Sequence, residues 1–255
     1  MVSVKFMPTK VPVIKCFFLF ILTFGLQQIR SVFSYISPSA EWLQSIIFLV
    51  ATCIPILIIK TEGASFREYG FMIPEGASRY FWASLFLAFF YVCIIIFLPG
   101  SVVGLEASPP VSISSSFFLT TASILLSSVA AETIFRGYIQ TSLTNAYGFA
   151  QALIISSIMF TLYMLPMPLY VEAGSTMFFY TAPSLFAESI FLGIFFEKTK
   201  TLICSITYST SATFLYTFTP LKPITSEYAI LVLVIPSIFF VLIMQFFRVK
   251  RVETM

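Results

Sequence analysis

The chain has 255 residues, of which 58% are hydrophobic and only 10% are charged. This composition excludes a soluble globular domain and indicates a chain whose main solvent is lipid. All eleven acidic residues are Glu, and the chain contains no histidine. Metal sites with imidazole ligands and catalytic triads that need His are therefore excluded, and we expect no metal and no cofactor. The basic residues are spread singly along the chain, so we expect no nucleic-acid partner.

Apolar runs divide the chain into eight candidate transmembrane segments, because a span needs about 20 mostly apolar residues to cross a hydrocarbon core of ~30 Å. In chain order they are residues 11–28, 42–59, 80–98, 111–131, 149–169, 176–196, 201–218 and 228–247. The end of the fourth stays open, because its helical pattern continues past Ala131 through Glu132 and Arg136 to Gln140. The predicted fold is an all-α polytopic protein with a single membrane domain over residues 1–255.

The distribution of Lys and Arg predicts the orientation of these segments, because short cytoplasmic loops retain positive charge. With the N-terminus inside, twelve of the fourteen basic residues fall on inner segments, and only Arg30 and Lys222 fall on outer ones. Both termini are therefore predicted to be cytoplasmic. We expect an integral, multi-pass protein, in the plasma membrane of a prokaryote or the endoplasmic reticulum of a eukaryote.

Two features are typical of a membrane–water interface. Lys15 lies near the cytoplasmic end of its segment, where its long side chain can reach the headgroups. The inner loop from residue 60 to residue 79 mixes charged residues with Phe66, Tyr69 and Phe71. This mixture predicts a loop that lies at the level of the headgroups.

Glu132 and Arg136 are ionisable residues inside an apolar segment, which by default marks a functional site. They are four residues apart, so both side chains lie on one face of a helix and can pair. In one interpretation the pair only fixes how the helix packs. In the other, Glu132 polarises or deprotonates a bound group while Arg136 orients it.

Two further polar features lie in later segments. Glu188 has no basic residue within four positions, so we expect an isolated and protonated carboxyl group. It serves either in a hydrogen bond between helices or as a functional acid that lines a cavity. The seventh segment holds seven Ser and Thr residues between Thr201 and Thr213. They either allow close helix packing or line a polar cavity.

The sequence Ala131-Glu132-Thr133-Ile134-Phe135-Arg136-Gly137 resembles the first motif, Glu-Glu-x-x-x-Arg, of the CPBP family. This family contains the CAAX prenyl protease and bacteriocin-processing intramembrane endopeptidases. Phe160 with Met164 resembles its second motif, Phe-x-x-x-His, and Ser209 with Thr213 falls where His-x-x-x-Asn is expected. The resemblance covers about residues 110–218 and rests on the order of the motifs.

The resemblance also shows which catalytic groups are replaced. Ala131 stands where the family has the Glu that activates water, and Met164 stands where it has the assisting His. Ser209 and Thr213 replace the His and Asn that polarise the scissile carbonyl, so only Glu132 and Arg136 remain. A general base contributes about 10²–10⁴-fold in rate and an oxyanion donor about 10²–10³-fold. The sequence therefore favours loss of proteolysis.

The sequence leaves three alternative hypotheses for the function. The first is a catalytically degenerate member that binds or regulates membrane-anchored or prenylated protein segments within the lipid bilayer. The second is an active endopeptidase that uses Glu132 as the base, helped by Glu188 or Ser209. The third is a transporter with a proton-coupled site at Glu188.

Overall fold

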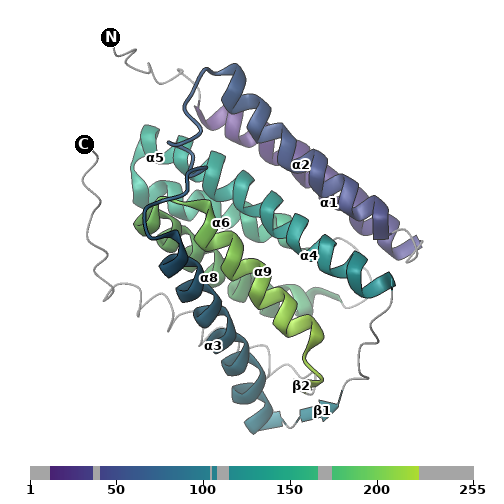
Figure 1. Cartoon of the computed structure of the whole chain (residues 1–255). Coiled ribbons are helices and arrows are strands. Elements are labelled where there is room, and N and C mark those ends of the chain that lie inside the picture. The colour runs from purple at the N-terminus through teal and green to yellow at the C-terminus, as the bar shows by residue number, and fades with distance from the viewer. Residues whose placement is uncertain (1–11, 37–40, 104, 108–114, 166–173, 224–255) are drawn as a thin grey trace.

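The computed structural model describes residues 12–36, 41–103, 105–107, 115–165 and 174–223, which form a helical bundle (Figure 1). Its helices are α1 (Pro12–Ile36), α2 (Glu41–Thr61), α3 (Ala77–Val103), α4 (Ser115–Glu132), the π-helix η1 (Thr133–Gln140), α5 (Thr141–Tyr147), α6 (Phe149–Met164), α8 (Gly174–Thr199) and α9 (Leu202–Phe218). Two strands of three residues, β1 (Leu105–Ala107) and β2 (Leu221–Pro223), pair antiparallel. Apart from this ribbon the predicted helical fold is confirmed for the described residues.

Each of the first seven predicted segments overlaps a helix, and the eighth, residues 228–247, lies outside the described residues. Four described helical stretches are long and apolar enough to cross a membrane: Pro12–Phe33, Trp42–Thr61, Ala77–Phe97 and Phe117–Tyr147. The last of them runs through α4, η1 and α5, so the open end of the fourth predicted segment is resolved as a helix that continues well past Ala131. The total of eight spans and the orientation of the termini stay predictions.

Helix α4 lies in the middle of the bundle, with α2 packed on one side and α9 on the other (Figure 1). Two apolar clusters form the interior. The first joins residues of α1, α2, η1 and α6, and the second joins residues of α3, α8 and α9. The first cluster also contains Ala130 and Ala131 of α4, so the helical segment formed by α4 and η1 belongs to the first cluster and packs against α9 of the second.

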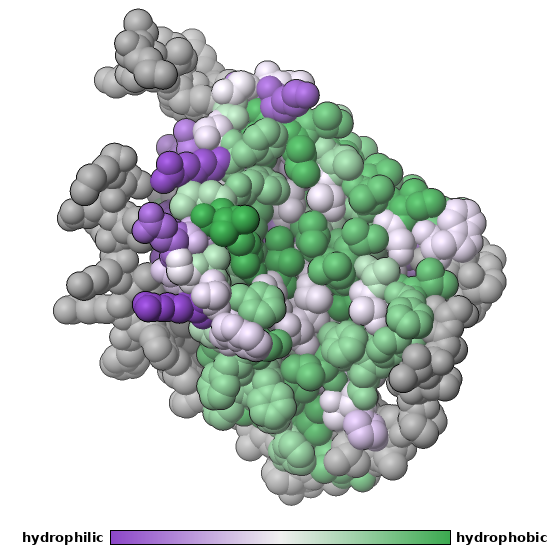
Figure 2. Space-filling view, in the orientation of Figure 1, coloured by the Kyte–Doolittle hydropathy of each residue, from purple (hydrophilic) through white to green (hydrophobic). Residues whose placement is uncertain are grey.

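Hydrophilic residues gather on one side of the visible surface, where the 62–76 loop and α5 lie, while most of the remaining face is apolar (Figure 2). We call this side the polar end. The loop is attached to the start of α9, because Leu202 donates its N–H to the Gly70 carbonyl at 3.0 Å and the Thr201 hydroxyl donates to the Met72 carbonyl at 2.9 Å.

Gly70 makes this attachment possible. It has a φ of +83°, and a Cβ atom here would lie 2.6 Å from Cε2 of Phe196. Any other residue would strain the backbone and push against the end of α8. The 62–76 loop is thus a packed part of the bundle.

Candidate functional site

The helix that carries the first motif changes its geometry at the motif. Helix α4 ends at Glu132, and the next eight residues, Thr133–Gln140, form a π-helix whose residues are all buried. π-Helical turns are rare and occur frequently at functional sites. The sequence does not predict this change, although the spacing of four places Glu132 and Arg136 on one helical face.

The structure brings Glu132 and Arg136 together deep in the bundle. Arg136 Nε lies 3.5 Å from Oε2 of Glu132, and their side chains are 1% and 0% exposed. The Nη2 group of Arg136 donates to the carbonyl and the hydroxyl of Ser189 on α8, at 3.2 and 3.1 Å. The predicted pairing is therefore confirmed, and the guanidinium also joins η1 to α8.

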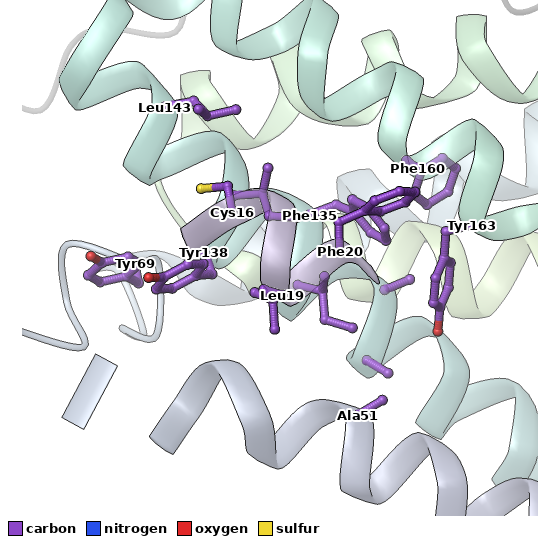
Figure 3. Packing of buried hydrophobic residues seen from close by; sticks show 14 of the residues in the cluster. Cys16, Leu19, Phe20, Ala51, Tyr69, Phe135, Tyr138, Leu143, Phe160 and Tyr163 are labelled. Atoms are coloured by element: carbon purple, nitrogen blue, oxygen red, sulfur yellow. The ribbon is translucent and has the colours of Figure 1, made fainter. Parts of the chain in front are cut away.

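Phe160, the residue kept from the second motif, covers this guanidinium. Its ring centroid lies 4.2 Å from Cζ of Arg136. Phe160 also meets the ring of Phe135 edge-on at 5.5 Å, and Tyr163 lies 5.1 Å from Phe135 (Figure 3). An aromatic face attracts a cation, most strongly where water is excluded, so Phe160 stabilises the buried charge.

Glu188 is not the isolated carboxyl group that the sequence predicted. It lies on α8 next to Ser189 and interacts electrostatically with both Arg136 and Glu132. The predicted isolation is wrong, because η1, more than fifty residues earlier in the chain, brings Arg136 near Glu188, although no described ion pair joins the two residues. The site therefore contains one arginine and two carboxyl groups, of which Glu132 forms the described ion pair.

The motif positions that have lost their catalytic groups lie in different environments. Ala131 is buried in the first apolar cluster. Met164 lies at the end of α6 and is 38% exposed. Helix α6 runs antiparallel to η1, since Phe160 contacts Arg136 while Leu153 and Gln140 both border Gly193. Met164, one turn beyond Phe160, therefore lies at about the depth of Glu132.

Ser209 and Thr213 follow Ser205 at intervals of four on α9, and Ser205 interacts with the Glu132 carboxyl group. Helices α4 and α9 are antiparallel, because Phe117 near the start of α4 contacts the ring of Phe218 at 4.9 Å. Ser209 and Thr213 thus lie one and two turns from the depth of Glu132, beside α4. Ser209 is partly buried and Thr213 is exposed. No described hydrogen bond joins either residue to Glu132.

Two glycines let the elements of the site approach one another. A Cβ atom on Gly193 of α8 would collide with Cδ1 of Leu153 and lie 2.8 Å from Oε1 of Gln140. Gln140, which sequence reasoning missed, donates from Nε2 to the Gly193 carbonyl at 2.9 Å. The available signal was a polar residue at every fourth position from Glu132 to Gln140. Gly137, after Arg136 in the motif, lies against Leu202 and the Tyr69 carbonyl.

A second polar cluster lies on the same helical segment at the polar end. Glu62 accepts from Lys15 Nζ at 2.7 Å and from the Tyr138 hydroxyl at 3.1 Å. The rings of Tyr138 and Tyr69 stack 5.7 Å apart (Figure 3). Burial, together with the nearby carboxylates, raises the pKa of the Tyr69 hydroxyl, so this phenol stays protonated at neutral pH. Lys15 is half-exposed, as expected for a residue near a membrane interface.

The comparisons agree with the motifs. A family model described as "Type II CAAX prenyl endopeptidase Rce1-like" matches residues 113–215. The matched stretch lies within the 110–218 region that carries the motifs, and it contains Glu132, Arg136, Phe160 and Glu188. This match confirms the family resemblance, and together with the apolar helices it indicates an integral membrane protein. No curated protein matches the chain.

Proposed function

We propose that this membrane protein, whose residues 113–215 match the Rce1-like family model, keeps the fold of an intramembrane endopeptidase without its proteolysis. It acts as a binding or regulatory module for a membrane-anchored or prenylated protein segment. The observation that carries this proposal is the environment of Ala131. The position where the family has its water-activating Glu is packed among apolar side chains of the first cluster.

The surviving acid supports the same conclusion. Glu132 is fully buried and forms its ion pair with Arg136, and neither of its carboxylate oxygens accepts a hydrogen bond within the described residues. A general base must reach the proton that it removes, directly or through one water molecule. A carboxylate that is paired with Arg136 is better suited to a structural role than to proton transfer. In that role the pair helps to fix η1 against α8 and α6 and so preserves the arrangement of the helices.

The proposed topology follows from the charges. We propose eight membrane spans, with the polar end and both termini in the cytoplasm, in the plasma membrane of a prokaryote or the endoplasmic reticulum of a eukaryote. The cluster of Lys15, Glu62 and Tyr138 supports this orientation, because Lys15 belongs to the basic N-terminal segment. Labelling of single cysteines placed in the 62–76 loop, from either side of sealed vesicles, tests it.

The function is tested with the purified chain in liposomes. The probes are a farnesylated peptide and an apolar transmembrane peptide, each with a photoactivatable group. We expect cross-linking that excess unlabelled peptide competes away, and full recovery of uncleaved peptide. Absence of competed cross-linking with both probes would overturn the binding role. Cleavage that Glu132→Gln abolishes would overturn the loss of proteolysis.

A second candidate is an active endopeptidase that uses Glu132 as its base. It is favoured by one observation: Glu188 and Ser205 both lie near the Glu132 carboxyl group, so a second acid and a hydroxyl group are close to it, although the Ser205 hydroxyl donates to the Leu202 carbonyl. The cleavage assay separates the two candidates. Activity in the wild-type chain that Glu188→Gln also lowers supports this candidate, and wild-type turnover equal to that of Glu132→Gln excludes it.

A further inference from the structure

Three polar atoms in the seam between η1 and α6 have no hydrogen-bond partner within the described residues. They are Nη1 of Arg136, Oε1 of Gln140 and the hydroxyl oxygen of Ser157. The side chains that carry them are at most 1% exposed. Buried polar groups in proteins are almost always hydrogen-bonded, to protein or to ordered water, so three of them in one seam require a partner.

The packing register places the three side chains next to one another in this seam. Arg136 bonds to Ser189 and Gln140 bonds to Gly193, one helical turn further along α8. On α6, Phe160 lies over the Arg136 guanidinium, while Leu153 meets Gly193 beside Gln140. Ser157 lies between Phe160 and Leu153 on α6. Ser157 therefore lies on the face of α6 that packs against Arg136 and Gln140.

The chemistry of the three atoms is complementary to one water molecule. Nη1 of Arg136 can only donate, Oε1 of Gln140 can only accept, and a hydroxyl group can do both. A buried water typically makes about three hydrogen bonds to groups that would otherwise be unsatisfied. We propose that Arg136, Gln140 and Ser157 form a binding site for an internal water molecule, which accepts from Arg136 and donates to Gln140.

This site completes the coordination of the buried guanidinium. Nε faces Glu132, Nη2 donates to Ser189, and Nη1 donates to the water. The planar fork of Arg136 is then held on every side, with Phe160 over its face. The water also links η1 to α6, where no direct side-chain hydrogen bond joins the described residues of these two helices. The proposal holds whether or not the protein cleaves a substrate.

The first test is solid-state NMR of the wild-type chain in liposomes, measuring transfer of polarisation from water to labelled side chains. Arg136→Lys identifies the Arg136 guanidinium signal by its loss. We expect transfer to Arg136 and to the Gln140 side-chain amide to be as fast as transfer to exposed Gln151. Transfer as slow as that to the backbone amide of buried Ile139 would overturn the proposal.

The second test uses two neighbouring buried serines on α6 that differ in their hydrogen bonds. Ser156 donates to the Leu153 carbonyl at 3.2 Å, whereas Ser157 has no partner within the described residues. Ser157→Ala takes one ligand from a bound water, so we expect slower transfer to Arg136 and a fall of about 2–4 °C in the unfolding temperature. In a dry seam, Ser157→Ala would remove an unsatisfied hydroxyl group and leave the unfolding temperature unchanged or higher.

Ser156→Ala is the matched control, and it should leave water transfer to Arg136 at the wild-type rate. Equal slowing by both substitutions would mean that α6 packing alone controls transfer, which would overturn the role of Ser157. Unchanged transfer and an unchanged or higher unfolding temperature in Ser157→Ala would do so as well.

Discussion

Two ion pairs adjoin the same helical segment at two depths. Glu132 and Arg136 lie in the interior with side chains 0% and 1% exposed and their charged atoms 3.5 Å apart. Lys15 and Glu62 lie at the polar end with side chains 42% and 14% exposed, and their charged atoms are only 2.7 Å apart. The shorter distance belongs to the more exposed pair, so distance alone does not rank the two pairs in energy.

Burial reverses the ranking in energy that the two distances alone would suggest. An exposed pair contributes about 0–1 kcal/mol, because water solvates both charges whether or not they meet. Removing one partner of a buried pair leaves an uncompensated charge in a medium that solvates it poorly. The inner pair is also held by three helices through Ser189 and Phe160, whereas the outer pair has Tyr138 as its further hydrogen-bond partner. The comparison therefore predicts unequal effects of equivalent substitutions.

The largest effect is expected for Arg136→Met. It keeps an unbranched side chain but leaves Glu132, and Glu188 beside it, without a positive neighbour. We expect the free energy of unfolding, measured in bicelles, to fall by about 3–5 kcal/mol.

The double variant Glu132→Gln with Arg136→Met is the control for this prediction, because it removes both charges of the ion pair. We expect it to recover a large part of the loss. If the single and double variants are equally unstable, the loss comes from the packing of the long Arg136 side chain. Burial of the charges would then not explain the difference between the two ion pairs.

A smaller effect is expected for Gly193→Ala. The new Cβ atom would meet Leu153 and Gln140, so α8 must move away from the site, at a cost of about 1–3 kcal/mol in the free energy of unfolding. Gly25→Ala on α1 is the matched control, since a Cβ atom there meets nothing within 4 Å and alanine favours a helix. Equal effects of the two substitutions would show that α8 does not constrain the inner site.

The sequence was sufficient to predict those structural features that depend on interactions between residues close together in the chain. Hydropathy located seven helices, and the spacing of four paired Glu132 with Arg136. The π-helix was missed. The Arg136 neighbour of Glu188 and the Gln140–Gly193 bond were missed because both depend on how α8 packs against η1. No run of residues around Glu188 encodes a partner that comes from another helix. The prediction of an isolated acid failed for that reason.

The same distinction applies to the motif. Phe160 and Gly137 were recognised as parts of a pattern, but only the structure shows what each contacts. Phe160 covers the guanidinium, and Gly137 lets Tyr69 and Leu202 approach η1. The placement of Met164, Ser209 and Thr213 relative to Glu132 remains a matter of helix register, and their roles stay proposals.

The smallest effect is expected at the polar end. Lys15→Met should lower the free energy of unfolding by about 0–1 kcal/mol, because Lys15 is half-exposed and Glu62 keeps its hydrogen bond from Tyr138. Glu62→Leu should cost more than Lys15→Met, since it removes the acceptor for both partners. Measured in low and in high salt, the effect of Lys15→Met should shrink as salt screens the exposed charges, while that of Arg136→Met should stay constant. A salt-independent effect at Lys15, as large as that at Arg136, would show that depth does not separate the two pairs.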